Sequence, residues 1–431
     1  MDNKNDCFVG VDIGSSGVRA CVINKNKEII FESRFSYDSS WSSNSINYEE
    51  EPSIWWDACI YVLDDVFQQS ALEVKSICVN GTSGTVLLCD KNGHPIGKTL
   101  LHDNSIAAYQ LPFLRGVAPS NSVVHTATSA LAKFLHLSKN LPNNVKYVLH
   151  QADWITGRLA NKFGFSDENN ALKMGFDPIN GIWPKWMRNC PIDLTLLPQV
   201  LPIGSSVGNL NPALKRRWDL TNFPAIVIGT TDSTAASLAC GIKNEGDAVT
   251  VLGSTLVLKI ISKKPIFNSK YGVYSQKFGD KWLVGGASNT GGNVLLNFFS
   301  IEQIKNLSKQ INYNRKTNLN YYPLKNKGER FPRNNPELLP KVDPRPSDDI
   351  AFLRGLLEGI SFIEKEGYQK LQELGAPRPL KIFTSGSGRK NKAWKNMRSH
   401  ILKIPMEEST QTEAAYGSAL IALGEKFSKN L

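Results

Sequence analysis

The sequence contains few cysteines, and none of them is arranged as a metal or redox site. Its 431 residues include seven cysteines, which are scattered along the chain without a C-x-x-C pair. An odd number of dispersed cysteines is typical of buried free thiols in a reducing compartment and does not indicate a disulfide framework. We therefore expect free thiols and a cytoplasmic protein.

Long hydrophobic runs are also missing. No stretch approaches the roughly 18 uninterrupted apolar residues that a membrane-spanning helix needs. The opening residues, Met1 to Cys7, are polar. The sequence thus gives no indication of export, and no membrane partner is expected.

Several catalytic signatures are absent as well. We find no paired-histidine metal site, no nucleophile elbow and no dinucleotide-binding fingerprint between a strand and a helix. The segment Asn92 to Thr99 differs by one residue from the phosphate loop G-x-x-x-x-G-K-[ST], because Asn92 stands at its first glycine. The chain continues there as an extended run to Leu101 and does not open a helix, so we predict a hairpin.

The basic charge of the chain is not concentrated in a nucleic-acid motif. The formal net charge is +11 and the pI is near 9.2. An anionic small substrate or a solvated basic surface explains this balance equally well, so no nucleic-acid partner is predicted. The excess is spread over three regions: Lys263 to Lys270, Lys305 to Arg333 and Lys381 to Lys403.

A chain of this length is too long for one ordinary core and predicts two large lobes with a cleft between them. Its content of 41% hydrophobic and 21% charged residues is typical of a globular protein. Glycine, serine, asparagine and proline gather between Pro202 and Phe223, which indicates the boundary. We predict an N-terminal lobe over 7–205, a linker or hinge region over 206–223 and a C-terminal lobe over 224–428.

The chain opens with two apolar runs joined by a small-residue turn. Phe8 to Ile13 and Val18 to Ile23 flank Gly14-Ser15-Ser16-Gly17, and Glu28 to Phe35 can add a third strand. The pattern of strand and small-residue turn recurs further on, so we predict one plan used in both halves. The recurrences lie at 77–89, 225–232 and 248–261.

Helical periodicity and one irregular segment complete the outline. Helices are predicted over 54–69, 350–374 and 413–427. The segment from Asn312 to Pro346 is rich in asparagine, lysine and proline and is long for a plain connection, so we predict a surface excursion.

Two of the small-residue turns could bind phosphate. Turns rich in glycine and serine let several backbone N–H groups converge on one anion. This pattern stands at Gly14 to Gly17, which includes Ser15 and Ser16, and again at Gly253 to Thr255, which includes Ser254. One such turn alone is an ordinary structural feature. Its recurrence in both halves favours phosphate binding.

Two aspartates follow apolar strands beside turns of this kind. Asp12 could hold a magnesium ion directly or through water, although it could instead cap an Asx turn. Asp232 follows Gly229-Thr230-Thr231 and could accept a proton from a substrate hydroxyl, although it could also cap a helix. We therefore treat Asp12 as a candidate metal ligand and Asp232 as the candidate general base.

A third glycine-rich segment could contact a purine base. Thr384-Ser385-Gly386-Ser387-Gly388-Arg389 follows an apolar run, and Trp394 lies one or two helical turns beyond it. Small residues let a base approach the backbone, and an indole can stack on it. A single tryptophan on a helix is as often part of the core, so both interpretations of Trp394 stay open.

Taken together, these segments resemble the FGGY carbohydrate kinases. The resemblance covers nearly the whole chain, and the segments follow one another in the same order as in the family. Within the family, the chain is most similar to the short D-ribulose kinase branch, formerly described as xylulose-kinase-like. It implies an α/β, two-lobed fold of the ribonuclease H-like kind found in actin, hexokinase and heat-shock ATPases, with an active-site cleft. It rests on V-D-I-G-S-S-G-V-R-A at 11–20, N-G-T-S-G-T at 80–85, G-T-T-D-S-T-A-A at 229–236 and S-G-S-G-R-K-N at 385–391.

The resemblance also implies roles for individual residues. Asp232 would be the catalytic base, Asp12 and Asp232 would surround Mg²⁺, and both would contact the sugar together with Ser83. ATP would bind between the lobes of a monomer or homodimer. Its expected contacts are Ser15, Ser16, Gly253, Ser254, Gly386, Ser387, Gly388, Asn391 and Trp394.

The expected sugar is D-ribulose. Ser233 follows the presumed base where glycerol kinases have glutamine, which disfavours glycerol. The Gln-Met-His-Gly segment usual in xylulose kinases is replaced by Gly81 to Gly84, which puts D-xylulose in doubt without excluding it. Two hypotheses from other classes stay open, namely an ATPase of chaperone or filament type and a sugar-binding regulator that has lost catalysis.

Overall fold

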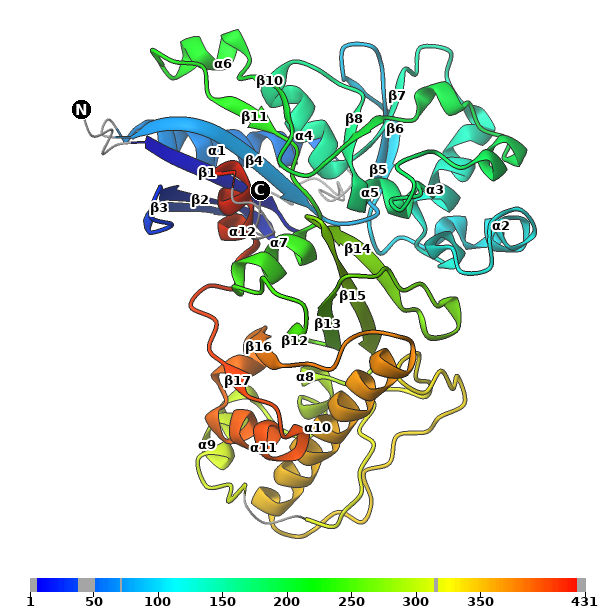
Figure 1. Ribbon diagram of the computed structural model, residues 1–431, viewed down its shortest axis with the longest axis vertical. Coiled ribbons are helices and arrows are strands. Elements are labelled where there is room, and N and C mark those ends of the chain that lie inside the picture. Colours follow the sequence, from blue (N-terminus) through cyan, green and yellow to red (C-terminus); the bar gives the residue numbers. More distant parts are fainter. Residues whose placement is uncertain (1–5, 38–50, 70–71, 314–316, 425–431) are drawn as a thin grey trace. The chain divides into compact units, whose positions relative to one another are not determined.

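The computed structural model describes residues 6–37, 51–69, 72–313 and 317–424. The chain forms two compact units, and it passes between them twice. The first unit runs to Ala239 and resumes at Glu413, whereas the second unit comprises Cys240 to Thr412 (Figure 1).

A six-stranded mixed sheet forms the centre of the first unit, in the order β10-β11-β4-β1-β2-β3. Strands β1, β4 and β11 run parallel, β2 pairs antiparallel with β1, and β3 pairs antiparallel with β2. The predicted opening hairpin and its third strand are therefore confirmed. The strands are β1 (Asp6–Ile13), β2 (Gly17–Asn24), β3 (Ile29–Ser36), β4 (Glu73–Gly81), β10 (Ser206–Asn209) and β11 (Ala225–Val227).

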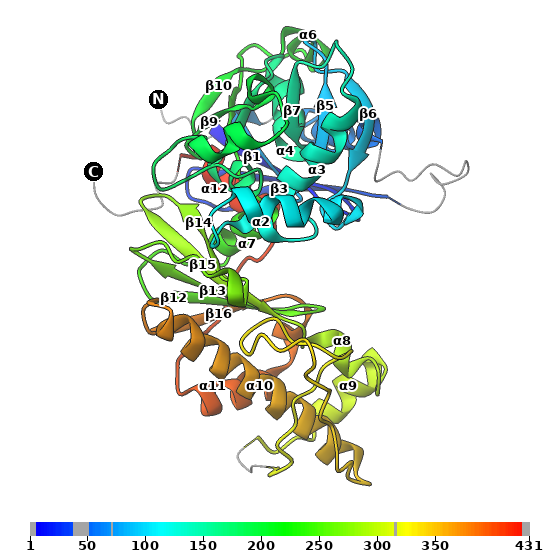
Figure 2. The ribbon, with the colours of Figure 1, turned by 90° about the vertical axis from the view of Figure 1, so that its right-hand side faces the viewer.

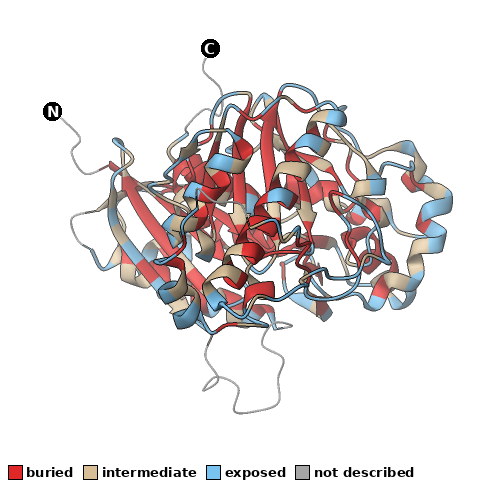
Figure 3. Cartoon of the chain, turned by 90° about the horizontal axis from the view of Figure 1, so that it is seen from below, coloured by how far each residue is buried: buried red, intermediate tan, exposed pale blue. Residues whose placement is uncertain are grey.

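Helices cover this sheet and bury its apolar side chains. Helix α1 (Pro52–Phe67) packs on β2 and β3, and helix α12 (Ala414–Ala422) packs on β1, β4 and α7 (Asp232–Ala239). Strand β1 is buried along almost its whole length. Figure 3 shows the buried residues of the chain gathered on the strands. The other helices of the first unit are α2 (Leu111–Val117), α3 (Ala130–Leu137), α4 (Gln151–Ala160), α5 (Glu168–Lys173) and α6 (Pro212–Arg217).

Helix α12 lies so close to β1 that only glycine fits at one position between them. A Cβ atom on Gly10 would lie 2.0 Å from the carbonyl oxygen of Ala415 and 2.2 Å from the backbone nitrogen of Ala419. We expect Gly10→Ala to lower the melting temperature, because overpacking against backbone costs at least about 1–3 kcal/mol of unfolding free energy. Gly116→Ala in α2 is the matched control, since no atom lies within 4 Å of its added Cβ. Equal melting temperatures for both variants would show that α12 can move away from the added Cβ atom at little cost in stability.

The first unit also contains two small sheets, one with the order β6-β5-β7 and one formed by β8 and β9. The predicted hairpin over 92–99 is confirmed, because β5 and β6 pair antiparallel. The predicted strand-turn-strand unit over 77–89 is wrong as a hairpin, since β4 belongs to the large sheet and β5 to the small one. The strands are β5 (Val86–Cys89), β6 (Pro95–Leu100), β7 (Tyr147–His150), β8 (Phe165–Asp167) and β9 (Gln199–Leu201).

The second unit repeats the plan of the first sheet. Its six strands have the order β14-β15-β13-β12-β16-β17, with β12, β16 and β17 parallel and the others antiparallel. The predicted hairpin over 248–261 corresponds to β12 and β13, so the repetition of one plan is confirmed here. The strands are β12 (Asp247–Leu252), β13 (Leu256–Ser262), β14 (Tyr274–Phe278), β15 (Lys281–Ser288), β16 (Lys381–Ser385) and β17 (Met406–Glu407).

Helix α10 (Asp349–Glu373) crosses one face of this second sheet beside α11 (Lys392–Leu402), as Figure 2 shows. Two shorter helices, α8 (Gly292–Leu295) and α9 (Ile301–Ser308), precede it. The three helices predicted from periodicity are thus present as α1, α10 and α12, with ends that differ by a few residues. Residues 425–427 of the last prediction lie outside the described residues.

Two segments differ from their predictions for a shared reason. Residues 206–223 contain β10 and α6, which belong to the first unit, so the change of unit comes after Ala239 and not in this segment. The predicted surface excursion of 312–346 sends Tyr321, Tyr322 and Phe331 into the core of the second unit. In both cases isolated apolar side chains anchor a polar segment that has no periodic pattern.

Candidate active site

The carboxyl ends of the parallel strands of the first unit gather the predicted acidic residues. Asp12 on β1 stands beside Asn80 on β4, and Gly81 pairs with Thr231 in an isolated bridge. Because parallel strands end at one edge of a sheet, residues far apart in sequence meet there. Asp12 and Asp232, the two predicted metal ligands, therefore lie in one site within the first unit.

Asp12 is a buried carboxylate whose cationic neighbour, among the residues that the structure describes, is Arg19. Its side chain lies 3.5 Å from Nη1 of Arg19, which also lies 3.4 Å from Oε2 of Glu413. Burial, and after it the nearby Asp232 carboxylate, raise the pKa of Asp12 to about 7, while Arg19 opposes the rise. The shift shows that Asp12 and Asp232 interact electrostatically.

These groups fit a magnesium ion. Within the described part of the chain, Oδ1 of Asp12 is buried without a hydrogen-bond partner. Mg²⁺ prefers carboxylate oxygens and is commonly bound through one or two of them together with water and phosphate oxygens. A cation here would satisfy the buried oxygen and reduce the repulsion between the two aspartates.

Asp232 is the first residue of helix α7. Its side chain is partly exposed, and its Oδ1 accepts a hydrogen bond from the backbone N–H of Ser233 at 2.6 Å. A negative charge is favourable at a helix N-terminus. The preceding segment is held by Asn169, whose Nδ2 donates to the hydroxyl of Thr230 at 3.0 Å. Asp232 thus has a fixed position at the sheet edge, and its role as a base stays a prediction.

Hydrogen bonds hold the residues on both sides of Ser83 in place. The backbone N–H and the hydroxyl of Thr82 donate to Oε1 of Gln151, at 2.9 and 2.8 Å. The buried ammonium of Lys133 donates to the carbonyl of Gly84 at 2.8 Å. The Ser83 hydroxyl is buried, and the described residues provide it with no partner. A ligand hydroxyl is the kind of group that would satisfy it.

The turn of Ser15 and Ser16 connects β1 to β2 next to Asp12. Both serines are exposed, and the turn is closed by a hydrogen bond from Gly14 N–H to the carbonyl of Gly17 at 3.0 Å. A Cβ atom on Gly17 would lie 2.1 Å from the carbonyl oxygen of Phe35. The glycine is therefore required for this turn to pack against β3.

In the second unit, the two predicted nucleotide-binding segments lie side by side. Strands β12 and β16 run parallel, and Gly253-Ser254 and Gly386-Ser387-Gly388 follow their carboxyl ends. Gly386 has a φ of 81°, and a Cβ atom there would lie 2.5 Å from the carbonyl oxygen of Leu252 and 3.1 Å from Gly253 N. Glycine thus permits a backbone contact that brings the two segments together.

Trp394 is part of the core, which is one of the two interpretations that the sequence left open. Its side chain is 2% exposed, and its indole N–H donates to the hydroxyl of Ser361 at 3.1 Å. A Cβ atom on Gly388 would lie 3.0 Å from the ring, so the indole supports Gly388 from within the unit. Asn391 caps helix α11 through Oδ1 and donates through Nδ2 to Ser308.

Several residues of the site were not predicted from the sequence. Arg19 faces Asp12 across the β1–β2 hairpin, so the length of the turn between the strands could have revealed it. Glu413 and Asn169 come from distant parts of the chain, and nothing in their local sequence signals the contact. The burial of Lys133 was also missed, since a lysine on an amphipathic helix is normally exposed.

The architecture defines a class of protein. Two α/β units, each with a mixed sheet and with glycine-rich turns at the carboxyl ends of its parallel strands, form the two-domain fold of sugar kinases related to actin and hexokinase. In the ranges that the structure describes, no helix combines the length and the apolar character needed to cross a membrane.

The chain belongs to the FGGY family of carbohydrate kinases, and it is an ATP-dependent phosphotransferase of that family. Residues 7–239 match the N-terminal domain of the family and residues 248–424 match the C-terminal domain. The xylulose kinase of Staphylococcus xylosus is 20% identical over 450 residues, which cover 97% of this chain and 91% of that protein. The resemblance to xylulose-kinase-like members is thereby confirmed.

Solved structures show the same fold. A xyloylose kinase from Brucella ovis has a TM-score of 0.85 at 18% identity and covers 99% of this chain and 93% of its own. The glycerol kinase of Plasmodium falciparum, solved with ADP, has a TM-score of 0.83 at 16% identity over 97% of this chain and 89% of its own.

Proposed function

We propose that the protein transfers the γ-phosphoryl group of ATP to the terminal hydroxyl of a ketopentose and so forms a pentose 5-phosphate. The observation that carries this proposal is the meeting of Asp12, Asp232 and the turn of Ser83 at one sheet edge. A kinase of this kind needs a proton acceptor, a site for Mg²⁺ and polar partners for a sugar. Each requirement has a matching group in the first unit.

Asp232 acts as the general base in this proposal. The sugar oxygen attacks the γ-phosphorus and forms a new P–O bond, the bond to the bridging oxygen of ADP breaks, and Asp232 takes the hydroxyl proton. Asp12 and Asp232 would hold Mg²⁺, which neutralises charge on the phosphates when it is bound. The Ser83 hydroxyl would bind a hydroxyl of the sugar.

Residues of the second unit bind the nucleotide. The Gly253-Ser254 turn offers backbone N–H groups to the phosphates, and the backbone at Gly386, Ser387 and Gly388 approaches the adenine. Ser15 and Ser16 of the first unit also contact phosphate oxygens. Asn391 contributes by fixing the start of α11, and Trp394 by supporting Gly388 from the core. The shared fold of a glycerol kinase that binds ADP supports a nucleotide on this framework.

D-ribulose is the first candidate substrate and D-xylulose the second. The N-G-T-S-G-T segment at 80–85 favours D-ribulose, because it replaces the segment usual in xylulose kinases. The curated relatives favour D-xylulose, since xylulose kinases match 96–97% of this chain. In both cases the reaction would take place in the cytoplasm, where buried thiols stay reduced.

An ADP-release assay tests the proposal directly. We expect Mg-ATP turnover with a ketopentose at least about a hundredfold above the rate without acceptor, a modest fraction of the rate gains that enzymes reach. The panel is D-ribulose, D-xylulose, L-ribulose, glycerol and no acceptor, with each product checked by mass.

The outcomes separate the candidates. Turnover on D-ribulose alone supports the first candidate, and turnover on D-xylulose alone replaces it with the second. ATP hydrolysis that no sugar stimulates would favour the ATPase hypothesis. Sugar binding without a phosphorylated product would favour the regulator.

A further inference from the structure

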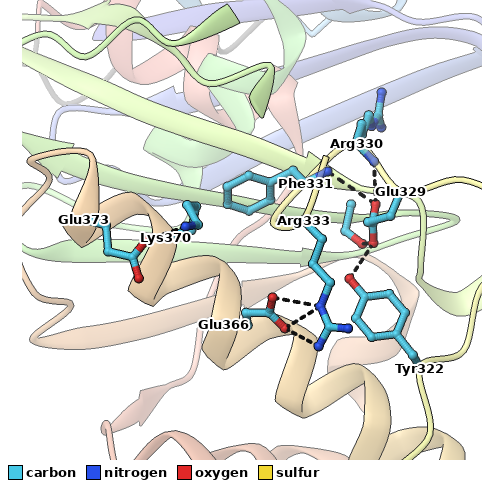
Figure 4. A network of polar contacts seen from close by, with 9 residues as sticks. Tyr322, Glu329, Arg330, Phe331, Arg333, Glu366, Lys370 and Glu373 are labelled. Carbon is cyan, nitrogen blue, oxygen red and sulfur yellow. Dashed lines mark hydrogen bonds and ion pairs between the residues drawn. The ribbon is translucent and has the colours of Figure 1, made fainter. Parts of the chain in front are cut away.

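A buried carboxylate in the second unit has no part in the reaction described above. Glu329 is 2% exposed and lies in the irregular segment that precedes α10. Its two oxygens accept hydrogen bonds from three backbone N–H groups and two hydroxyls. Figure 4 shows the contacts with Tyr322, Arg330 and Phe331. The donors are Asn289, Arg330 and Phe331 through their backbone, and Ser288 and Tyr322 through their hydroxyls.

The neighbouring arginines are engaged elsewhere. Arg333 forms an ion pair with Glu366 on α10 and stacks over the ring of Tyr322 at 4.3 Å. Arg330 donates through Nε to the carbonyl of Ala287 at 2.7 Å. Burying an ionised carboxylate is costly unless hydrogen bonds replace its hydration. Glu329 obtains that compensation from neutral donors, two of which lie on consecutive residues, Ser288 and Asn289.

The segment that follows Ser288 packs directly against the Gly253-Ser254 turn. The N–H of Leu256 donates to the carbonyl of Thr290 at 2.7 Å, and the N–H of Gly292 donates to the carbonyl of Gly253 at 2.8 Å. A Cβ atom on Gly291 would lie 2.6 Å from the carbonyl oxygen of Ser254. Residues 288–292 therefore form a supporting segment that packs against the turn.

Glu329 holds the first residues of this supporting segment in place. The Ser288 hydroxyl donates to Oε2 of Glu329 at 2.5 Å and accepts from the N–H of Thr290 at 3.1 Å. The N–H of Asn289 donates to Oε1 at 2.8 Å, and its side-chain amide donates to the carbonyl of Gly328 at 3.0 Å. One carboxylate thus sets the path of the chain immediately before it reaches the turn.

We propose that Glu329 is a positioning residue that holds the Gly253-Ser254 turn, through Ser288 and Asn289, in the conformation that binds nucleotide phosphates. The inference rests on the proposed role of that turn in binding ATP. Backbone N–H groups bind an anion well only when they are already oriented, because otherwise ordering them consumes part of the binding free energy.

Glu329→Gln tests the proposal with little change in volume. The glutamine removes the negative charge and places an N–H₂ group opposite the Ser288 and Tyr322 hydroxyls, which must then accept a hydrogen bond instead of donating one. We expect the Kd for Mg-ADP, measured by calorimetry, to rise about tenfold, in line with the loss of charge-assisted hydrogen bonds. The KM for the sugar should stay within about twofold at saturating ATP, since sugar contacts are independent in this scheme.

A local readout separates positioning from general destabilisation. Hydrogen exchange of the peptide covering 251–258 should accelerate in E329Q more than exchange of β1. Glu366→Gln is the matched control, because it weakens the exposed ion pair with Arg333 close to the same network. We expect this control to leave the Kd for Mg-ADP unchanged, as exposed pairs contribute little.

Ser288→Ala serves as the second variant if E329Q does not fold. It removes one donor to Glu329 and one acceptor for the N–H of Thr290. Like E329Q, it should raise the Kd for Mg-ADP. A folded E329Q, or S288A in its place, with wild-type ADP affinity and wild-type exchange at 251–258 would overturn the inference alone. Failure of the wild-type protein to bind Mg-ADP would overturn the proposed function and this inference together.

Discussion

Asp232→Asn is expected to reduce sugar phosphorylation by about a hundredfold or more, which is the usual effect of losing a general base. Asparagine has nearly the same size, and its carbonyl oxygen can still accept the hydrogen bond from Ser233 at the start of α7. It cannot take the proton of the sugar hydroxyl. The loss should therefore appear in kcat, while the Kd for Mg-ADP changes little, because the asparagine oxygen can still coordinate Mg²⁺.

The prediction is checked by steady-state kinetics together with calorimetry and thermal melting. Asp193→Asn is the control, because Asp193 also caps a short helix in the first unit, through Thr195, and lies in a surface segment. The control should retain wild-type turnover. Wild-type activity in Asp232→Asn would remove this residue from the mechanism, and a large fall in melting temperature would point to a structural role.

Several strands of both large sheets could be predicted from the sequence because their local signals are strong, whereas β10, β14, β15 and β17 were not predicted. Phe8 to Ile13 and Val18 to Ile23 are apolar runs separated by a turn that only small residues can form, and this fixes a hairpin without distant contacts. The register of that hairpin places Arg19 opposite Asp12. The same reasoning located β12 and β13 in the second unit.

Sheet membership could not be predicted in this way. The turn at Gly81 to Gly84 resembles the other small-residue turns, yet β4 leaves the large sheet there and the chain begins a different sheet at β5. The choice depends on long-range pairing of β4 with β1 and β11, which no local pattern encodes. The same limit applies to β10, which joins the large sheet from within a segment that looked like a linker.

The site was predicted in part. Asp12 and Asp232 could be recognised because a carboxylate directly after an apolar strand is unusual, and the structure does bring them to one edge. Glu413 and Asn169 complete the surroundings of these residues from distant elements, through contacts that sequence spacing does not reveal. For Trp394 the sequence allowed both a ligand contact and a core position, and the side chain lies in the core.

A buried ion pair in the second unit leads to the other large prediction. Arg398 on α11 and Glu364 on α10 are each 1% exposed in their side chains. Arg398 donates to both carboxylate oxygens of Glu364, at 2.6 and 2.7 Å, and to the hydroxyl of Thr384 on β16 at 2.8 Å. Thr250 on β12 donates to the same carboxylate at 2.6 Å. The pair thus joins two helices to the two strands that carry the nucleotide-binding segments.

Arg398→Met is expected to lower the unfolding free energy by about 3–5 kcal/mol, because it leaves a buried carboxylate without its cation. Lys395→Met on the same helix is the control, since Lys395 pairs with Glu408 at the surface and should contribute at most about 1 kcal/mol. Urea unfolding followed by circular dichroism measures both effects. A small change in the unfolding free energy of Arg398→Met would mean that Glu364 takes up a proton or that water enters the space left by the arginine.

The double variant Arg398→Met, Glu364→Leu separates the charge from the packing. Replacing both partners with apolar side chains removes the uncompensated charge, so we expect it to recover a large part of the stability lost in Arg398→Met. Thr250, Tyr368 and Thr384 would lose a shared partner, which limits the recovery. A double variant that is as unstable as Arg398→Met would show that these side chains depend on the pair for their hydrogen bonds. Full recovery would instead show that the pair contributes no net stability to the unit.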